Sequence, residues 1–432
     1  MSAWQSVKLG DVADLKGGYA FKSGEYSNDG MFVLRTVNIG NNGEITKDGA
    51  TYIPHSKVRE YERFLLKAHD ILFVMVGATL GKIGYVRESA LPALLNQNMW
   101  VIRTLDDNKL DQRYLHYCFK YFSSKALGWA SGSARGFVKR DDFRNLDLEI
   151  PPIDEQKQIA SLLTAADDKI ELNRRMNETL GEIARALFKS WFVNFDPVRA
   201  KAKGRKPEGM DAATAALFPA AFNDDGLPEG WTTKKLSDVT SELRRGISPK
   251  YTDVGGIRVL NQKCIRDSVV SFSPARHHNH LSKPVKDREL IRGDILVNST
   301  GVGTLGRVAQ IWTLEEPTVV DSHVTVVRAK KTKITSTYLG LNLLTRQSEI
   351  EGLGEGSTGQ TELNRGRLGN LNLTAPPLPL LERFENILTP FIDKMSCNQA
   401  ENILLSSLRD TLLPKLISGE LRIEHIKRNQ GN

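Results

Sequence analysis

The chain has 432 residues, 59 of them lysine or arginine and 51 aspartate or glutamate, which gives a formal net charge of +8. This length predicts two or three domains, and the positive charge favours an acidic partner such as nucleic acid without requiring one. The 3 cysteines are too widely spaced for a disulfide framework or a four-ligand zinc site, and the longest apolar run, around Ile71 to Leu80, is too short to span a membrane. Because the N-terminus also lacks a secretory signal pattern, we expect a cytoplasmic protein.

The first 150 residues have the pattern of a strand-rich domain. Short runs of Val, Ile and Phe, such as Phe32–Leu34 and Ile71–Val74, alternate with clusters of Gly, Asn and Asp. A helical stretch is expected near Arg113 to Leu127. We therefore predict one α/β domain over residues 1–150.

The hydrophobic period changes to that of a helix after Pro151-Pro152. Asp154 and Glu155 give this helix an acidic first turn, which the helix dipole favours. Apolar residues then recur at helical spacing, at Ile159, Leu163, Ala166, Ile170, Leu180, Ala184, Leu187 and Trp191. The spacing predicts a helix of about 40 residues within 151–196, ending at Pro197 and longer than a typical globular helix.

Residues 197–229 have the composition of a connector. Basic residues are dense near its start, at Arg199, Lys201, Lys203, Arg205 and Lys206. This charge predicts an exposed linker, with one short helix over Ala212–Leu217.

A second strand-rich pattern begins at Trp231 and occupies residues 230–375. After Pro376-Pro377, a second long helix is expected within 376–432. Its apolar residues are Phe384, Leu388, Phe391, Met395, Leu405, Leu408 and Leu412. Pro390 and Pro414 lie within this stretch, and because proline removes a helical hydrogen bond and clashes with the preceding turn, we expect kinks or a break there.

The two halves of the chain repeat one another. The recurring landmarks are Asp70-Ile71-Leu72 with Asp294-Ile295-Leu296, Thr79-Leu80-Gly81 with Thr304-Leu305-Gly306, Arg103 with Arg328, Leu146 with Leu371, and Pro151-Pro152 with Pro376-Pro377. The last four pairs share one offset of 225 residues, as between Pro151 and Pro376. This period far exceeds the roughly 20 to 50 residues of a solenoid repeat. We predict an α+β protein with two duplicated α/β domains separated by two long helices, and a ligand that is itself bipartite.

Each long helix carries an asparagine in its apolar stripe at the same register, Asn173 and Asn398. A buried asparagine in a coiled-coil core costs stability but penalises misaligned pairing. Asparagines that face each other would therefore fix the register of an antiparallel coiled coil within the chain. The alternative interpretation is that both lie at the edge of the stripe, and the sequence leaves both open.

Several motifs match cofactor or metal signatures only in part. Gly301–Gly306 has G-x-G-x-x-G spacing, but a strand-like run follows it, which favours a glycine-rich hairpin that approaches a ligand backbone. Gly77–Lys82 is too short for a P-loop, and Ile83 replaces the magnesium-binding Ser or Thr. His277–His280 has no acidic or thiol neighbour and no counterpart in the first copy, so we predict an exposed loop there.

Two further segments resemble catalytic loops without completing them. The carboxylates of Asp154–Lys157 lie at a helix start, where the dipole explains them. Asn194–Val198 lacks the second proline and the aromatic residue of an amino-methyltransferase loop. Because no catalytic arrangement is suggested in both copies, we expect a chain that is not an enzyme and holds no metal or cofactor itself.

Polar and basic loops of the strand-rich domains remain as candidate ligand contacts. Arg, Lys, Asn and Gln pair with base edges in the DNA major groove, while Lys, Ser and Thr hold phosphates. The two copies differ most in these loops, a pattern that suits two readers of different short sequences. The DNA-binding candidates are Arg35, Asn38, Thr79, Lys82, Asn96, Asn98, Arg135, Lys139 and Arg140 in the first copy, and Asn261, Gln262, Lys263, Asn298, Thr304, Arg307, His323, Gln360, Asn364 and Arg365 in the second.

Three segments resemble the specificity subunit of type I restriction-modification enzymes. They are Pro151–Gln156 (PPIDEQ), Ala186–Lys201 (ALFKSWFVNFDPVRAK) and Leu408–Leu421 (LRDTLLPKLISGEL), and the resemblance extends over essentially the entire chain. It implies two target recognition domains, each of which reads one half of a split double-stranded DNA site. It further implies that helical regions at 151–196 and 376–432 form an antiparallel coiled coil.

The same resemblance implies partners that carry the chemistry. Two methyltransferase subunits would dock on the helices, and translocating restriction subunits would join that complex. S-adenosylmethionine, ATP and magnesium are then expected on the partners and not on this chain. Candidate docking residues are Glu155, Gln156, Trp191, Phe192, Leu412 and Leu416.

One departure from the family pattern is visible in the second copy. Pro376-Pro377 is followed by Leu378-Pro379-Leu380-Leu381, without the Glu-Gln of the first copy. Contacts made by those acidic and amide groups are therefore expected to be asymmetric. A different class of function also stays open, a coiled-coil adaptor whose strand-rich domains bind proteins without sequence-specific DNA binding.

Overall fold

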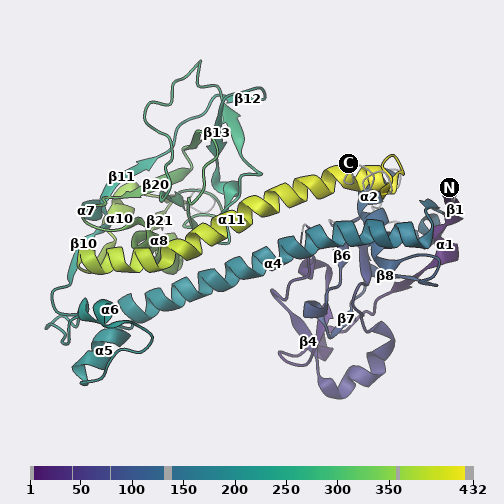
Figure 1. The fold of residues 1–432 in the computed structure, drawn as a ribbon, viewed down its shortest axis with the longest axis horizontal. Helices are drawn as coiled ribbons and strands as arrows, with labels where there is room; N and C mark the ends of the chain where they lie inside the picture. Colours follow the sequence, from purple (N-terminus) through teal and green to yellow (C-terminus); the bar gives the residue numbers. More distant parts are fainter. Residues whose placement is uncertain (1–3, 41, 78, 131–138, 357–360, 424–432) are drawn as a thin grey trace, which may run out of the picture. The chain divides into compact units, whose positions relative to one another are not determined.

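The structure, a computed structural model, describes residues 4–40, 42–77, 79–130, 139–356 and 361–423 (Figure 1). The chain forms two compact units, residues 1–171 with 401–432, and residues 172–400. Each unit contains one strand-rich domain and part of each long helix.

The first domain contains two sheets and a separate strand pair. The larger sheet consists of β2 (Ala13–Gly17), β8 (Met99–Thr104), β5 (Ile71–Val74) and β6 (Ile83–Tyr85), in that order. The smaller sheet consists of β4 (Thr51–Ile53), β3 (Met31–Leu34) and β7 (Ala93–Leu95), and β1 (Gln5–Lys8) pairs with β9 (Asp147–Ile150). The helices are α1 (Leu9–Val12), α2 (Gln112–Ala130) and α3 (Arg140–Arg144), with 3₁₀ turns that include η2 (Thr36–Asn38). The helix expected near Arg113 to Leu127 is therefore confirmed as part of α2.

The second domain repeats this plan. Its larger sheet consists of β11 (Thr240–Arg245), β20 (Val324–Ala329), β17 (Ile295–Asn298) and β18 (Val308–Gln310), in the same order as the first. Its other sheet consists of β12 (Tyr251–Thr252), β16 (Arg276–His278), β13 (Ile257–Leu260) and β19 (Thr318–Val320). Short pairs are β10 (Thr232–Lys235) with β23 (Asn372–Ala375), β14 (Ile265–Arg266) with β15 (Val269–Val270), and β21 (Gly354–Glu355) with β22 (Glu362–Leu363). The helices are α7 (Leu236–Val239), α8 (Ser336–Thr345), α9 (Gln347–Gly352) and α10 (Arg365–Gly369), and η5 covers Gln262–Cys264. The predicted duplication is thus confirmed for the larger sheet, whose four strands have the same order in both domains, and for the strand pairs β1–β9 and β10–β23.

The central strand of each larger sheet separates two hydrophobic cores. Successive side chains of a strand point to opposite faces, and all 4 residues of β5 are buried. Ile71 and Phe73 belong to the core that contains α2, whereas Leu72 and Val74 pack with the smaller sheet. The run Ile71–Val74 has no polar face because both sides of the strand are covered.

A buried ion pair explains two of the repeated landmarks. Arg103 donates to both carboxylate oxygens of Asp70, at 2.5 and 2.6 Å, and Arg328 binds Asp294 in the same bidentate way, at 2.7 and 2.8 Å. Asp70 and Asp294 are almost wholly buried. A carboxylate removed from water is tolerable when it is paired this closely with a cation, so the landmarks belong to the scaffold of each domain.

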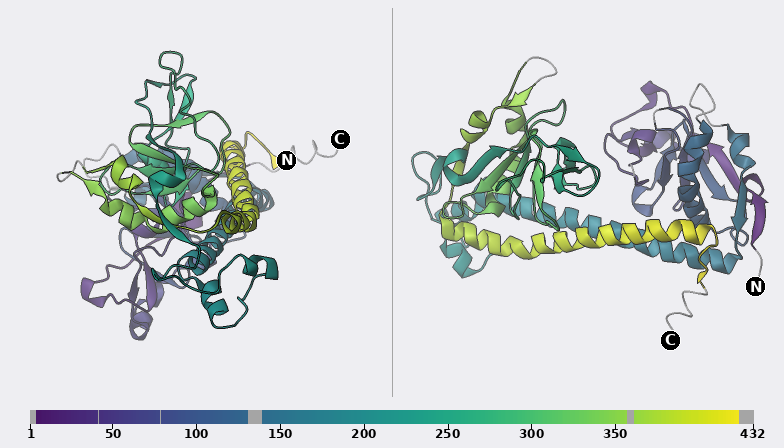
Figure 2. Two further views of the ribbon diagram at one scale, coloured as in Figure 1. Left: turned by 90° about the vertical axis from the view of Figure 1, so that its left-hand side faces the viewer. Right: turned by 90° about the horizontal axis from the view of Figure 1, so that it is seen from above.

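The two long helices are α4 (Ile153–Phe192) and α11 (Leu378–Ile417), each 40 residues long. In the second unit, Asn398 donates to Asn177 at 2.8 Å, while the rings of Phe188 and Phe384 lie 6.4 Å apart. Positions along α4 rise as those along α11 fall, so the helices run antiparallel, and Figures 1 and 2 show them side by side. The expected α+β fold with a helix pair is confirmed. No described helix is both long and apolar enough to cross a membrane.

The prolines of α11 do not break it. The helix continues through Pro390 and Pro414, so the expected break is wrong. Leu388 and Ile392, on either side of Pro390, are buried in the core of the second domain. Burial of this apolar face offsets the one hydrogen bond that each proline removes.

The connector 197–229 is also packed more closely than its charge predicted. It forms α5 (Asp196–Ala202) and α6 (Ala212–Ala216), the second of which confirms the expected short helix. Val198 and Phe218 are buried, and Phe218 contacts Trp191 edge to face at 5.1 Å. Most of the segment is exposed, as predicted, including Arg199, Lys203, Arg205 and Lys206. The buried apolar residues nevertheless fasten it to the core of the second domain, and Lys201 donates to the Ala215 carbonyl oxygen at 3.1 Å.

The histidine segment is not an exposed loop. His277 and His278 lie in β16, and His278 is fully buried, with its ring bonded to Lys250 and to the Lys283 carbonyl oxygen. Backbone groups occupy both ring nitrogens of His278, which gives it a structural role. Among the described residues, no group of three or more His, Cys, Asp and Glu side chains is placed to hold a metal ion.

Candidate nucleic-acid interface

The larger sheet of each domain has one end at which the polar loops meet. Gly17 at the end of β2 pairs with Trp100, and Val74 at the end of β5 pairs with Met99. In the second domain Arg245 pairs with Thr325 and Asn298 with Val324. The β5–β6 and β7–β8 turns therefore leave the first sheet at the same end, and the β17–β18 and β19–β20 turns leave the second at the equivalent end. We call each of these ends, together with its turns, a sheet end.

Backbones approach so closely at each sheet end that glycine is required. A Cβ at Gly18 would lie 2.0 Å from the carbonyl oxygen of Asn96, and one at Gly246 would lie 2.1 Å from that of Asp321. Any side chain would force these segments apart. The two copies thus hold the chain after β2 or β11 against the turn before β8 or β20 in the same manner.

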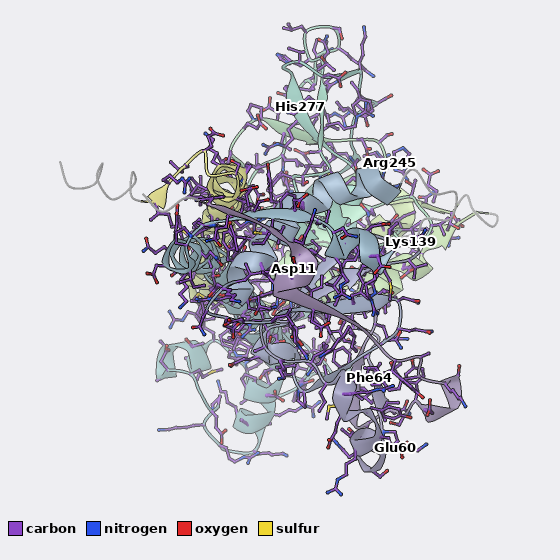
Figure 3. All side chains as sticks on the ribbon, turned by 90° about the vertical axis from the view of Figure 1, so that its right-hand side faces the viewer. Asp11, Glu60, Phe64, Lys139, Arg245 and His277 are labelled. Atoms are coloured by element: carbon purple, nitrogen blue, oxygen red, sulfur yellow. The ribbon has the colours of Figure 1, made fainter. Side chains whose placement is uncertain are left out.

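In the first domain the sheet end presents amide and basic side chains. Asn98 is exposed and adopts a left-handed backbone with φ of 73°, and Asn96 donates to the hydroxyl of Tyr26 at 3.3 Å. Arg140 lies beside Gly17, because a Cβ there would come within 3.6 Å of Nη2 of Arg140. Lys139, labelled in Figure 3, is exposed at the start of α3. Thr79 and Lys82 lie in the β5–β6 turn, with Thr79 exposed.

In the second domain the same end holds a hydrogen-bonded group. Thr300 donates to Oε1 of Gln262 at 3.2 Å, and its hydroxyl lies 2.8 Å from Nδ1 of His323. Thr304 donates to the Thr300 carbonyl oxygen at 3.2 Å, and Arg307 donates to that of Gly303 at 2.8 Å. These bonds confirm that Gly301–Gly306 is the turn of a β17–β18 hairpin.

The start of α10 continues this surface. Asn364 caps the helix, with its side-chain oxygen accepting from the backbone N–H of Gly366 at 2.7 Å, and Arg365 is exposed. Lys263 is exposed beside Gln262. The structure thus brings Lys263, His323 and Arg365, which are far apart in the sequence, to one end of the domain.

Four candidates instead support the backbone from within. Asn38 and Asn298 are fully buried, and Asn38 accepts from the Arg35 N–H and donates to the Asp48 carbonyl oxygen, both at 3.1 Å. Arg35 donates to the Gly49 carbonyl oxygen, and Asn261 donates to that of Pro274. Each of the four donates a side-chain hydrogen bond to a backbone carbonyl oxygen of the chain, which gives them structural roles that their residue types did not reveal. Arg135 and Gln360 lie outside the described residues.

Sequence reasoning missed two members of the second sheet end. Arg245, labelled in Figure 3, donates to the Leu363 carbonyl oxygen at 2.8 Å and pairs with Glu362 at 2.6 Å, so it ties β22 to the sheet end. Thr300 links Gln262 to His323. The run Arg244-Arg245-Gly246 before the close approach was a signal for the first, whereas nothing near Thr300 distinguished it.

Burial also shapes the electrostatics of this end. Asp321 is 4% exposed and accepts from the His323 N–H at 2.9 Å. Burial raises the pKa of Asp321 above its ordinary value, more than that hydrogen bond lowers it. The carboxyl group of Asp321 therefore lies inside the domain and holds the β19–β20 turn, while the side chains that the turn presents outward are Ser322 and His323.

Most of the candidate docking residues lie in the cores of this chain. Trp191 and Phe192 pack in the core of the second domain, and Leu416 is fully buried in that of the first. Leu412 is partly buried against the latter core, and Glu155 pairs with Arg422 at 3.2 Å. These side chains hold the helices to the domains.

Gln156 is a buried residue that joins the start of α4 to the first domain by hydrogen bonds. It is 1% exposed, accepts from the Asp111 N–H at 2.9 Å, and donates to the carbonyl oxygens of Lys109 and Pro151. Leu381, at the same position of the second copy, is also buried. The second copy therefore has a leucine packed in its core where the first copy has a hydrogen-bonded glutamine.

Known proteins resemble this chain in sequence and in fold. The family model for the type I restriction modification DNA specificity domain matches residues 1–182 and 228–406. The chain is 24% identical to the HindI specificity subunit of Haemophilus influenzae, with 98% of this chain and 100% of that protein covered. It is also 24% identical to the MjaIX specificity subunit of Methanocaldococcus jannaschii, covering 98% and 94%.

The fold resembles the crystal structure of the S subunit of a type I restriction-modification system from M. genitalium. The TM-score is 0.61 at 16% identity, over 96% of each chain. Two matching DNA specificity domains, a shared fold and full-length relatives agree, and the chain therefore belongs to the type I restriction modification DNA specificity family.

Proposed function

We propose that this chain is the recognition subunit for a split site in double-stranded DNA, with one half-site bound at the sheet end of each domain. The observation that carries the proposal is that equivalent turns leave equivalent sheet ends while their exposed side chains differ, as Asn98 and His323 do. A shared framework with different hydrogen-bonding groups is what two readers of different short sequences require.

Basic and neutral side chains would contribute differently to binding. Exposed Lys139, Arg140, Lys263 and Arg365 are placed to neutralise phosphates. Each phosphate contact would add a slope of about 0.9 to the dependence of log affinity on log salt, without sequence choice. Base contacts by amide and imidazole groups, at roughly 1–3 kcal/mol each, would supply that choice.

We assign the chemistry to partner subunits. Methylation and cleavage would be carried out by two methyltransferase subunits and by restriction subunits, which would bind S-adenosylmethionine, ATP and magnesium. The groups gathered at the described sheet ends include amides, hydroxyls, an imidazole and guanidinium or ammonium cations, which suit recognition of bases and phosphates.

Exposed apolar residues on the long helices support the docking of two partners. Leu172 and Ile183 on α4 are 54% and 44% exposed. Residues 11 apart lie on one face of a helix, since about 3.6 residues make a turn. On α11 the positions with the same offset of 225 are Cys397, which is exposed, and Leu408, which is 54% exposed. Such repeated apolar exposure suits two equivalent interfaces.

Exchange of one domain tests the proposal. Residues 230–375 would be replaced by the corresponding domain of another family member, and the complex with methyltransferase subunits would be assayed on random duplexes. We expect the new preference to differ from the original in one half-site only. As a matched control, exchange of residues 1–150 should change the other half.

Two results would contradict this model. A change in both half-sites after one exchange would mean that the domains do not bind independently. Complexes without any sequence preference would instead favour the protein adaptor.

A further inference from the structure

We propose that Gln262, Thr300 and His323 form a base-reading triad in the second domain, in which Gln262 reads an adenine and His323 the amino group of a neighbouring base. This inference rests on the proposed DNA-reading function of the sheet end. The three residues come from η5, from the β17–β18 turn and from the β19–β20 turn, and the hydroxyl of Thr300 joins the other two.

The backbone around the triad is fixed on both sides. The Ser299 N–H donates to the carbonyl oxygen of His323 at 2.8 Å, and Asn298 donates from its side chain to the carbonyl oxygen of Gln262 at 3.1 Å. Both donors belong to the segment that leads into Thr300. The turns that carry Gln262 and His323 are therefore held in place before any ligand binds, which lowers the entropy cost of recognition.

Glycine makes room for Gln262. The φ of Gly301 is 103°, and a Cβ there would lie 2.8 Å from Oε1 of Gln262 and 2.3 Å from the hydroxyl oxygen of Thr304. A side chain at this position would displace the amide from Thr300. The first glycine of the Gly301–Gly306 motif thus serves to seat a side chain, and no cofactor is needed to explain it.

Thr300 has one hydroxyl proton, and this determines the donor and the acceptor in both hydrogen bonds of the triad. Because Thr300 donates to Oε1 of Gln262, its oxygen accepts from Nδ1–H of His323, and Nε2 of a neutral His323 is then an acceptor. Nε2 of Gln262 is a donor, and Oε1 retains a second lone pair. Neither of these Nε2 atoms has a hydrogen-bond partner among the described residues. His323 is exposed, and Nε2 of the half-buried Gln262 is not one of the buried unpaired atoms, so both side chains are accessible to a ligand.

This set of groups matches particular bases. Adenine offers N7 as an acceptor and N6 as a donor in the major groove, and a glutamine amide satisfies both. An acceptor such as Nε2 of His323 matches the amino group of adenine or cytosine and leaves the carbonyl oxygens of guanine and thymine unpaired.

The first domain lacks the parts for the same triad. The positions equivalent to Gln262 and His323 are Thr36 and Asn98. The position equivalent to Thr300 is Met75 or Val76, and neither residue has a hydroxyl group. The two half-sites are therefore read by different devices.

Selection from a duplex library randomised over the second half-site, with the complete complex of this chain and its methyltransferase subunits, tests the triad. Gln262→Ala should reduce the preference for adenine at one position by roughly 5- to 150-fold, and His323→Ala should relax a neighbouring position. Thr300→Val should weaken both by roughly 2- to 10-fold, whereas Thr300→Ser, which keeps the hydroxyl, should restore them. The first half-site should not change.

Lys263→Ala is the matched control, since it lies beside Gln262 and is exposed. It should lower affinity for all sequences alike and reduce the salt slope by about 0.9. If the wild-type complex selects a split site while Gln262→Ala and His323→Ala leave every preference in its second half unchanged, the triad is refuted and the DNA-reading function stands. A wild-type complex without sequence preference would overturn both.

Discussion

Gln156 shows how one side chain fastens a long helix to a domain. Its amide satisfies the Asp111 N–H and two carbonyl oxygens, while Leu381 fills the same position of the second copy with apolar volume. Gln156→Leu would keep the volume but leave buried backbone groups unpaired. We expect it to lower the free energy of unfolding of the first unit by roughly 1–3 kcal/mol, measured by denaturant titration.

Lys157→Ala provides the comparison, because Lys157 is exposed in the same helical turn. It should change the same free energy by less than about 0.5 kcal/mol. Equal effects of the two substitutions would show that the hydrogen bonds of Gln156 do not hold the helix.

His116 gives the first unit a defined dependence on pH. Burial lowers the pKa of His116 to about 3. The unfolded chain binds a proton at this residue below an ordinary value of about 6.5, whereas the folded chain does not until the pH approaches the lowered value. The stability that neutral, buried His116 permits is therefore fully present above the ordinary pKa of about 6.5, and it is lost as the pH falls from there toward the lowered pKa.

The substitution His116→Phe should remove this dependence. Relative to the variant, the wild-type unit should lose about 1.4 kcal/mol of unfolding free energy between pH 7.5 and pH 5.5. Unfolding titrations across that range measure the difference, and the two proteins should keep parallel profiles above pH 7.5. Parallel profiles below pH 6 would mean that His116 is protonated in the folded state.

At the scale of elements, the helix pair is aligned by a polar contact in an otherwise apolar stripe. Asn398, which is 1% exposed, donates to Asn177 at 2.8 Å, and Asn177 donates to the Met395 carbonyl oxygen at 3.3 Å. Asn173 is fully buried in the same stretch of α4, so the interpretation that both predicted asparagines lie at the edge of the stripe is wrong. Their direct pairing stays a prediction, because Asn398 donates to Asn177.

A double-mutant cycle measures the value of this contact. Asn177→Leu and Asn398→Leu should each destabilise the second unit by about 1–2 kcal/mol, because each leaves a buried partner unsatisfied. The double variant should cost less than the sum of the two, with a coupling of roughly 0.5–1.5 kcal/mol in denaturant titrations. Strictly additive losses would show that the two amides do not interact.

For the whole molecule, the duplication predicts the composition of its complex. If Ile183 and Leu408 mark two equivalent docking surfaces, Ile183→Asp should remove one methyltransferase subunit, Leu408→Asp the other, and the double variant both. A carboxylate in an apolar interface loses its hydration without gaining a partner, which is why binding should fail. Native mass spectrometry of the assembled complexes counts the subunits.

Arg185→Asp is the control, because it places the same carboxylate at another exposed position of α4. It should leave the complex intact. Loss of both methyltransferase subunits after a single substitution would contradict two independent surfaces.

The properties that the sequence alone determined are those carried by local periodicity and by repetition. The offset of 225 residues identified the duplication, the helical spacing gave α4 its length, and the strand-like run after Gly301–Gly306 indicated a hairpin. Each depends on residues a few positions apart, or on the same pattern appearing twice.

Tertiary structure alone decided which side chains are available to a ligand. Asn38 and Asn98 are the same residue type, yet Asn38 is fully buried in η2 and Asn98 is exposed in the β7–β8 turn. Trp191 was a predicted docking residue for a partner subunit, but the connector and the second domain cover its side chain. Gln262, Thr300 and His323 meet because η5, the β17–β18 turn and the β19–β20 turn come together, although they are far apart in the sequence. Burial and proximity of this kind depend on partners that no local pattern records.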